Sequence, residues 1–573
     1  MTTRSSKPTS HTLSGSQILL ESLILMGVDT IFGYPGGAIM PIYDALYDYS
    51  DRLRHILVRH EQGASHAAEG WARVRNKPGI CFATSGPGAT NLVTGIADAM
   101  MDSVPLVCIT GQVSSNLLGS DAFQEADVIG ITTPITKWNC QVTKASEIAE
   151  VVAKAYHIAG TGRPGPVLID ITKDAQFEKV EYIPVSRVHI PGYQPVTVPN
   201  PRQIEVAAKL LNDAKRPYIL AGHGVLISHA SEELMQLAEV GSIPVAVTLH
   251  GLSSIPTNHP NYVGWLGMHG NYGPNILTNK ADVICAIGMR FDDRVTGRLK
   301  DYAPHAKIIH IDIDPAELHK NVKTVVPIVA DAKQALTALI PLIKKVDRTS
   351  WLREFREYYD IEYHQVIKNE IKPTSGKIQM AEVVHELSII TKGDAVIVPD
   401  VGQHQMKTCR YYSFNKPDSL ISSGGMGTMG FALPAAMGAQ VASDRQVVAI
   451  IGDGCFQMTI QELGTIDQEK IPVKVIILNN NHLGMVRQWQ ELFFEKRYSF
   501  THLHNPDFIQ ICKGYGIPAK KVEQRSQLRK SIQAMLNHKG PYVLEVVCEQ
   551  FENVFPMIPT GASVDEVKLS QNA

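Results

Sequence analysis

Two polar clusters follow apolar runs in the last third of the chain. Gly452-Asp453-Gly454 follows "VVAII", and Asn479-Asn480-Asn481 closes the run "VKVIIL". Asp453 and Asn480 are 27 positions apart, a fair length for one crossover between parallel strands, so both should reach the same sheet edge. A carboxylate and an amide oxygen suit Mg²⁺, and flanking glycines let backbone amides approach an anion. The spacing therefore predicts a site for Mg²⁺ and a diphosphate.

A further carboxyl group with possible chemistry is Glu61 in "LVRHEQGASHAAEG" (57–70), between a short strand and a helix. Taken alone, an acid at this place is typical of a helix N-terminus, where the dipole favours it. The first pair also has a structural alternative, an Asp that caps the next helix beside an Asn-rich turn.

Strand ends in the middle of the chain carry Gly and Asp. "YILAGHG" (218–224) and "ADVICAIGMRFDDRVTGR" (281–298) each run from a strand into a turn, and "IIHIDIDP" (308–315) places Asp312 and Asp314 at a third strand end. Asp331 follows a fourth apolar run, "VVPIVA". Because acids at such ends commonly meet ribose hydroxyls, the set predicts a dinucleotide site. The Gly-His-Gly turn alone would fit any tight turn.

Alternating strand-like and helical stretches predict an α/β protein with parallel sheets. Residues 183–201 hold five prolines in 19 positions and indicate an extended linker. A polar helical stretch near 351–370 is followed by a new helix expected from about 376. We therefore divide the chain into domains at 1–185, 200–345 and 375–573. Residues 80–110 and 448–478 share one pattern of strand, Gly-x-Gly turn, helix and strand, which suggests that the outer domains are related.

Composition narrows the functional class. The 573 residues are 44% apolar and 19% charged with net charge −2, which is typical of a large globular protein and gives no reason to expect a nucleic-acid partner. Eight cysteines lack any C-x-x-C spacing and indicate reduced, buried thiols. No apolar run reaches the ~18 residues of a membrane helix. The first residues, "MTTRSSKPTSHTLSG", lack a secretory apolar segment, and we expect a frayed tail there.

The motifs resemble a known family over almost the whole chain. "GDG" followed by "NN" resembles the thiamine diphosphate motif. "IFGYPGGAIMPIYDAL", "HEQGA", "TSGPGATN" and "GQVSSNLLGSDAFQEADV", then "DVGQHQM", "SGGMGTMGFALPAA" and "NNNHLGMVRQWQELF", resemble in order the large subunit of acetohydroxyacid synthase (acetolactate synthase). The resemblance implies three doubly wound parallel-sheet domains, which bind the cofactor pyrimidine, FAD and the cofactor diphosphate in turn.

The resemblance assigns roles residue by residue. Glu61 would activate thiamine diphosphate held by the third domain of a neighbouring subunit. Asp453, Asn480 and the backbone carbonyl of His482 would bind Mg²⁺. Met429 would hold the cofactor bent, Met485 would lie near the reacting centre, and Trp489 would contact the second substrate. Further expected positions are Gln124 and Lys173 on the approach to the site, and Gln403, His404, Gly427, Gly452 and Gly454 around the cofactor.

"LGMHG" and "RFDDRVTG" resemble the family's FAD-binding segments, and the flavin would serve no net redox step. The implied FAD contacts are Arg163 from the first domain and, in the middle domain, Gly222, His269, Gly288, Arg290, Asp293, Arg294, Asp312 and Asp331.

The implied reaction is a carboligation. Pyruvate loses CO₂, and its two-carbon remainder is joined to pyruvate, giving 2-acetolactate, or to 2-oxobutyrate, giving 2-aceto-2-hydroxybutyrate. These products begin valine, leucine and isoleucine synthesis. Water exclusion is needed, so we expect a lid from 485–500 and the segment "FENVFPMIPTG". The alternatives are pyruvate oxidase, a 2-oxo acid decarboxylase, the flavin-free catabolic acetolactate synthase, and an inactive binding subunit.

One position departs from the family pattern, because Ser114 follows "GQV" where plant and fungal members usually have proline. That position borders the family's herbicide channel, so sensitivity to such inhibitors is in doubt. The resemblance also implies a homodimer or homotetramer with active sites at subunit interfaces, and a separate regulatory small subunit. The short N-terminus leads us to expect a cytoplasmic bacterial protein or one of the plastid stroma.

Overall fold

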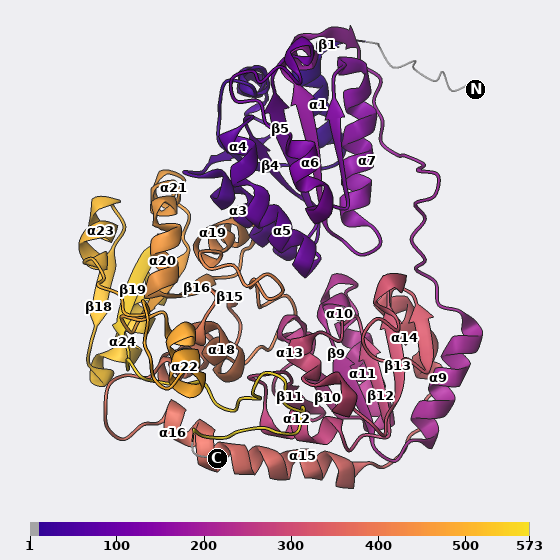
Figure 1. Ribbon diagram of the computed structural model, residues 1–573, viewed down its shortest axis with the longest axis vertical. Helices are drawn as coiled ribbons and strands as arrows, with labels where there is room; N and C mark the ends of the chain where they lie inside the picture. Colours follow the sequence, from indigo (N-terminus) through magenta and orange to yellow (C-terminus); the bar gives the residue numbers. More distant parts are fainter. Residues whose placement is uncertain (1–10, 572–573) are drawn as a thin grey trace, which may run out of the picture.

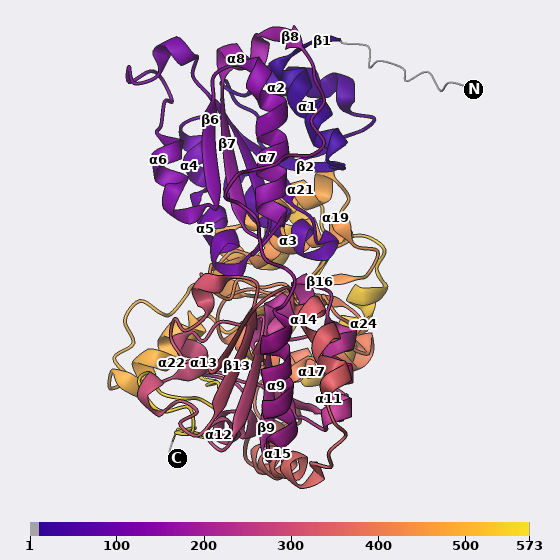
Figure 2. The same cartoon turned by 90° about the vertical axis from the view of Figure 1, so that its right-hand side faces the viewer.

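Three parallel β-sheets flanked by helices organise residues 11–571, the part of the chain that the computed structural model describes (Figure 1; Figure 2). The α/β fold expected from the sequence is confirmed. Most of the expected N-terminal tail, residues 1–10, lies outside the described residues. Within residues 11–571, no helix is long and apolar enough to cross a membrane.

The first sheet has six parallel strands in the order β3-β2-β4-β5-β7-β6. Its strands are β2 (Thr30–Gly33), β3 (Arg54–Leu57), β4 (Gly79–Ala83), β5 (Leu106–Gln112), β6 (Trp138–Val142) and β7 (Pro166–Thr172). Its helices are α1 (Gly15–Leu25), α2 (Met40–Leu46), α3 (Glu61–Arg75), α4 (Pro87–Asn91), α5 (Val93–Asp102), α6 (Val128–Thr132), α7 (Ile148–Gly160) and α8 (Lys173–Phe177). A short antiparallel pair, β1 (Thr12–Ser14) and β8 (Lys179–Glu181), closes the domain.

Alternate residues of β4 serve two different cores, because successive side chains of a strand point to opposite faces. Ile80 and Phe82 pack with α1, α2 and α7. Cys81 and Ala83 belong to a core that includes α3 and α5 and continues into the third sheet. One face of the first sheet is thus a core of its own domain, and the other is shared with the third.

The middle sheet also has six parallel strands, in the order β11-β10-β9-β12-β13-β14. Its strands are β9 (Pro217–Ala221), β10 (Val245–Val247), β11 (Tyr262–Trp265), β12 (Val283–Ile287), β13 (Lys307–Asp312) and β14 (Val326–Val329). Its helices are α9 (Pro201–Asp213), α10 (His223–Ile227), α11 (Ser231–Gly241), α12 (Tyr272–Thr278), α13 (Asp293–Thr296) and α14 (Ala332–Leu339).

The third sheet has five parallel strands in the order β15-β16-β17-β19-β18. Its strands are β15 (Val396–Pro399), β16 (Val447–Gly452), β17 (Lys474–Asn479), β18 (Ala519–Val522) and β19 (Tyr542–Val547). Its helices are α17 (Met380–Thr391), α18 (Gln403–Tyr411), α19 (Ala432–Ala442), α20 (Asp453–Met458), α21 (Leu463–Gln468), α22 (Gly484–Phe493), α23 (Phe508–Gly514) and α24 (Arg525–Asn537). This order matches the order β2-β4-β5-β7-β6 within the first sheet. In both sheets the last strand along the chain lies inside the sheet and the strand before it lies at the edge, which supports a relation between the outer domains.

Helices α3 and α19 join the first domain to the third (Figure 2). Small residues allow the close crossing: a Cβ added to Gly70 would collide with the carbonyl of Ala435, and one added to Gly438 with that of Ala67. Helices approach this closely only where side chains are absent or small.

Two connections join the sheets along the chain. Residues 182–200 carry no helix or strand, in keeping with the prolines of the predicted linker. After the middle sheet, α15 (Thr349–Glu362), a π-helical turn (Tyr363–Ile367) and α16 (Lys368–Ile371) lead to the third. Helix α17 begins at Met380, later than the start expected near 376, because Ile378 forms a β-bridge with Cys548 and Gln379 is extended.

Candidate active site

Asp453 and Asn480 lie at the carboxyl ends of adjacent strands. Strands β16 and β17 pair in parallel with Gly452 opposite Leu478, so the two groups reach one edge of the sheet. The Asp453 side chain is buried, and its Oδ2 accepts a 2.6 Å hydrogen bond from Asn505 Nδ2. Asn505 was not predicted, because it lies outside the motif and reaches the site only through the fold. Its amide also donates to Asn479 and Asn481, so it ties the Asn cluster to Asp453.

A cavity of about 50 Å³ opens over this edge, and buried polar atoms face it without partners. Asn480 Nδ2, Gln403 Oε1 and His404 Nε2 are each buried and lack a hydrogen bond. Buried polar groups normally have partners, so three orphans on one wall indicate a polar ligand. The cavity is lined by Gln403, His404, Met429, Gly452, Asp453, Gly454, Asn480, His482 and Met485 among the predicted residues.

Glycines shape the walls of this cavity. A Cβ on Gly452 would lie 2.7 Å from the His404 ring, and one on Gly484 would collide with Gln403 Oε1. A Cβ on Gly454 would lie 2.8 Å from the Leu483 side chain. Each glycine therefore leaves room for the neighbouring side chain and for a ligand. The orphaned atoms and this cradle fit a diphosphate with its metal ion.

Burial shifts the protonation of two groups in this cavity. It raises the pKa of Asp453 to about 6, although the hydrogen bond from Asn505 opposes the shift. It lowers the pKa of His404 to about 3, so that side chain is neutral near pH 7. A cation beside Asp453 would favour the ionised carboxylate, whereas the neutral His404 ring has one nitrogen free to donate a hydrogen bond.

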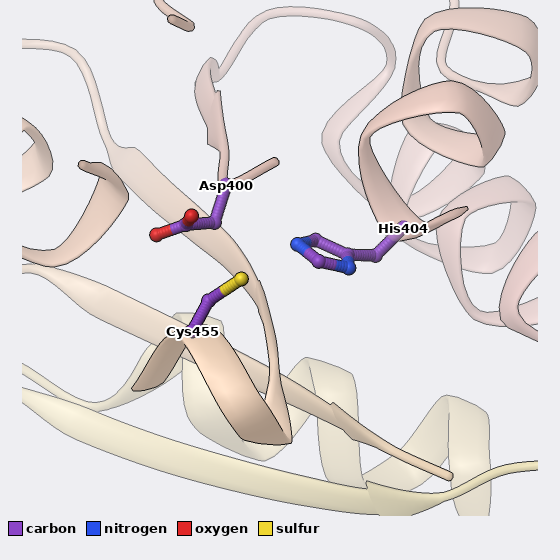
Figure 3. Close-up of side chains that lie close together, drawn as sticks. All are labelled: Asp400, His404 and Cys455. Carbon is purple, nitrogen blue, oxygen red and sulfur yellow. The ribbon is translucent and has the colours of Figure 1, made fainter. Parts of the chain in front are cut away.

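Asp400, His404 and Cys455 gather beside the cavity (Figure 3), with possible ligand atoms within 4.8 Å of one another. Asp400 Oδ1 accepts from the backbone amides of Val401 and Gly430, and its Oδ2 accepts from Ala432 N. The carboxylate is thus already committed to the backbone, and we interpret the cluster as a support for the loop around Gly430 rather than a metal centre. Asp400 ends the run "VIVPD", the same signal as at Asp453, and sequence reasoning missed it.

A second cavity, of about 640 Å³, adjoins the first. The two share Val401, Gly402, Met429, Met485 and Val486 in their walls. The larger one extends over the carboxyl ends of the middle-sheet strands, and its volume suits a large cofactor. The buried Trp265 lines it with its indole N–H lacking a partner. An orphaned donor and the acid at the end of β13 fit a nucleotide-type ligand.

Most predicted FAD contacts lie on the wall of this larger cavity, namely Arg163, His269, Gly288, Arg290, Arg294, Asp312 and Asp331. Two do not. The Asp293 side chain is 78% exposed, and Asp292 lines the cavity instead. Gly222 is not among the lining residues; it lies directly before α10, and a Cβ there would collide with the carbonyl of Gly288, which does line the cavity.

Arg163 connects the first domain to the middle one at the cavity rim. Its guanidinium lies 3.2 Å from Asp314 and 2.8 Å from Glu317, and it donates to Ser103 Oγ. Asp312 is nearby, and burial raises its pKa to about 7. The rim thus offers both a fixed cation and a carboxyl group that titrates near neutrality.

Three predicted residues of the first domain lie outside both cavity walls, namely Glu61, Gln124 and Lys173. Glu61 is buried at the start of α3, and its Oε2 accepts from Asn91 Nδ2 at 2.9 Å. The Gln124 backbone packs on Gly86, the residue before α4. Lys173 begins α8 at the end of β7. None of these three lines either cavity described above.

Trp489 lies on helix α22. Its side chain lines the larger cavity and packs on Phe493 with ring centroids 4.9 Å apart.

The two segments expected to form a lid contact each other. Gln488 Oε1 accepts a hydrogen bond from Val554 N, and the Tyr498 and Phe551 rings lie 6.2 Å apart. Gly427 also lines the larger cavity, on the loop that leads to Met429.

Family models match all three domains. The model described as the thiamine pyrophosphate enzyme N-terminal TPP binding domain matches residues 13–131, the central domain matches 204–339, and the C-terminal TPP binding domain matches 400–546.

Curated relatives align along nearly the full chain. The acetolactate synthase large subunit of Mycobacterium tuberculosis is 46% identical over 98% of this chain and 92% of its own length. That of Corynebacterium glutamicum is 46% identical over 97% and 90%. The acetolactate synthase isozyme 2 large subunit of Escherichia coli is 43% identical over 97% of this chain and 99% of its own.

Proposed function

Since this chain belongs to the acetolactate synthase large subunits of the thiamine pyrophosphate enzymes, we propose that its smaller cavity holds Mg²⁺ and the cofactor diphosphate, and its larger cavity FAD. The observation that carries this proposal is the shared wall of the two cavities, with orphaned polar atoms in the smaller, Met429 and Met485 in both, and Trp489 in the larger.

The activity is that of the family. The chain is the catalytic subunit of an acetolactate synthase, which decarboxylates pyruvate and transfers the two-carbon unit to a second pyruvate or to 2-oxobutyrate. This is the first common step in the synthesis of valine, leucine and isoleucine. Bound thiamine diphosphate supplies the electron sink for the decarboxylation.

The residues around Asp453 would bind the metal ion and the cofactor diphosphate and hold them in position. Asp453, Asn480 and the His482 carbonyl would hold Mg²⁺, with Asn505 fixing the carboxylate. The neutral His404 would donate a hydrogen bond to the diphosphate through Nε2, which now lacks a partner. Gln403 would lie beside the diphosphate, but its unpartnered Oε1 only accepts hydrogen bonds and so would not bond the phosphate oxygens. Met429, on the wall of both cavities, would support the bent cofactor.

A neighbouring copy of the chain would complete the site. Glu61 lines neither cavity of its own chain, so its carboxyl would reach a cofactor held by a second subunit and hydrogen-bond the pyrimidine ring there. Gln124 and Lys173, from the same domain, would line the entrance for the 2-oxo acid. The proposal therefore requires at least a dimer, with homodimer and homotetramer both compatible.

FAD would occupy the larger cavity without a redox role, held by Arg163, Arg290 and Asp312 among the lining residues. This favours the biosynthetic enzyme over the flavin-free catabolic one. An inactive binding subunit is disfavoured because Glu61, Asp453 and Asn480 are all present.

The large-subunit names of the relatives support a separate regulatory small subunit as partner. The cysteines at all eight positions are free, which goes with a proposed reducing compartment such as a bacterial cytoplasm or the plastid stroma.

Acetolactate formation from pyruvate tests the proposal, with thiamine diphosphate, Mg²⁺ and FAD each left out in turn. We expect a need for all three. Full activity without FAD would contradict the flavin assignment. Acetaldehyde or acetyl phosphate in place of acetolactate would instead contradict the carboligase activity.

A further inference from the structure

Two carboxyl groups on α5 reach from the first domain to a loop of the third, residues 422–430. Asp102 accepts hydrogen bonds from the backbone amides of Gly424, at 2.8 Å, and Gly425, at 2.7 Å. Asp98 accepts one from Ser423 Oγ at 2.5 Å. Because positions four apart share one face of a helix, α5 holds this loop with a single face.

The loop is pressed against its partners. A Cβ on Gly425 would lie 2.7 Å from Asp102 Oδ1 and 2.8 Å from Arg290 Nη2, and one on Gly424 would collide with His250. No side chain larger than hydrogen fits at either position without moving Asp102, His250 or Arg290. The contact is therefore sensitive to displacement of any of these groups.

Asp102 is also held from two other directions. Arg73 of α3 lies 3.1 Å from its carboxylate, and so does His250 of the middle domain. Burial alone would raise the pKa of Asp102, but its interactions with His250, Arg73 and the Gly424 amide hold it well below its ordinary value. Asp102 is thus an ionised carboxylate bound by groups from all three domains.

This contact lies between the two cavities. Asp102, His250, Gly424 and Gly425 line the larger cavity, and the same loop continues to Met429, which lines both. The Asp102 side chain is already shielded from water, whereas the His250 side chain is 16% exposed. A molecule that fills the larger cavity would cover His250 and press on Gly424 and Gly425, and so would hold these groups against the Asp102 carboxylate.

We propose that Asp102 is a positioning residue that couples the two cavities, so that FAD in the larger one fixes the 422–430 loop and thereby strengthens cofactor binding at Met429. This rests on the proposed function, which places FAD in the larger cavity. Linkage requires the effect to be reciprocal: thiamine diphosphate must strengthen FAD binding by the same factor.

The test measures binding rather than activity. The full chain is freed of cofactors, and the Kd of thiamine diphosphate at fixed Mg²⁺ is measured by tryptophan fluorescence with and without saturating FAD. We expect FAD to tighten binding on the order of 10-fold in the wild type. In Asp102→Asn, the ratio of the Kd of thiamine diphosphate without FAD to that with FAD should fall close to one. The matched control is Asp170→Asn, a buried aspartate of the same domain whose side-chain partners are Thr110, Gln112 and Gln141 of its own sheet.

The control should keep the wild-type ratio. If Asp102→Asn does not fold, Gly425→Ala takes its place, because its Cβ would displace the same carboxylate, and we expect the same loss of coupling. An unchanged ratio in the variant that folds would overturn the proposal. FAD that binds the wild type without changing the Kd of thiamine diphosphate would overturn it too, whereas failure of FAD to bind at all would refute the flavin assignment on which it rests.

Discussion

Glu462 accepts hydrogen bonds from the backbone amide of Arg59 with both carboxylate oxygens, at 3.1 and 3.3 Å. Arg59 lies two residues before Glu61, so a side chain of the third domain fixes the start of α3 and with it the predicted activating glutamate. Gly63 leaves the space for this contact, since a Cβ there would lie 2.5 Å from Glu462 Oε1.

Glu462 should make stability depend on pH. Burial raises its pKa from 4.5 to about 7, against the opposing hydrogen bonds from Thr465 and Arg59. Between these values the folded state keeps the proton and the unfolded chain loses it. This group's contribution is therefore fully present below about pH 4.5 and falls by about 1.4 kcal/mol per pH unit at most until about pH 7.

Urea unfolding across that pH range measures the effect. The difference in stability between wild type and Glu462→Gln should change with pH in this window and become constant above it. Asp467→Asn, which removes a carboxyl of α21 paired with Lys470, is the matched control and should run parallel to the wild type. A pH-independent difference for Glu462→Gln would contradict the prediction.

Glu61→Gln should lower the rate of acetolactate formation by about 10²–10⁴-fold, because an amide cannot play the acid–base role of the carboxyl. Binding of the cofactor diphosphate and Mg²⁺ should remain measurable, since Asp453, Asn480 and His404, which are proposed to hold them, are unchanged. Steady-state rates and cofactor titration on one preparation separate the two effects. Glu21→Gln, which removes an exposed first-domain charge paired with Arg52, should leave the rate unchanged; a Glu61→Gln enzyme as active as that control would refute the assignment.

Asn505→Ala should weaken Mg²⁺ binding by about 10–100-fold, because the variant loses the 2.6 Å hydrogen bond that orients Asp453. The measurement is a Mg²⁺ titration at saturating thiamine diphosphate. Asn415→Ala, which loses a single bond to the Lys392 carbonyl at the surface, serves as control. Equal Mg²⁺ affinity in both variants would show that Asn505 does not support a metal ligand.

Trp489→Leu should reduce the preference for 2-oxobutyrate over pyruvate as acceptor by about 10-fold, because one methylene in an apolar contact is worth about 1–3 kcal/mol. Competition between the two acceptors, read from the product ratio, gives the value. Phe493→Leu is the control, since Phe493 packs on Trp489 but does not line the cavity. If both variants shift the ratio equally, the effect comes from the helix and not from contact with the acceptor.

Those parts of the site that lie at strand ends could be predicted from the sequence. Gly452-Asp453-Gly454 and Asn480 could be placed because a parallel sheet gathers the carboxyl ends of its strands at one edge. The middle-domain acids Asp312 and Asp331 were placed on the same ground, and both line the larger cavity.

The site residues that could not be predicted from the sequence depend on contacts between segments that are distant along the chain. Asn505 and Glu462 act across the fold on Asp453 and Arg59, and no local pattern distinguishes them from ordinary polar residues. Asp293 and Asp292 are neighbours in the chain, and only the turn at the start of α13 decides that Asp292 faces the cavity. Periodicity resolves faces of a helix but not which member of an adjacent pair a loop turns inward.

The stretch from 182 to 200 connects the first and middle domains and packs on the first, where Lys137 Nζ donates to Tyr193 Oη. It carries no helix or strand, while the first domain is fastened to the third by α3 and α19 and by Glu462, far away in the chain. The order in which the domains are encoded is therefore independent of the order in which they are joined in space. A division of the chain within this stretch would leave the contacts of α3, α19 and Glu462 in place, since all three lie outside it.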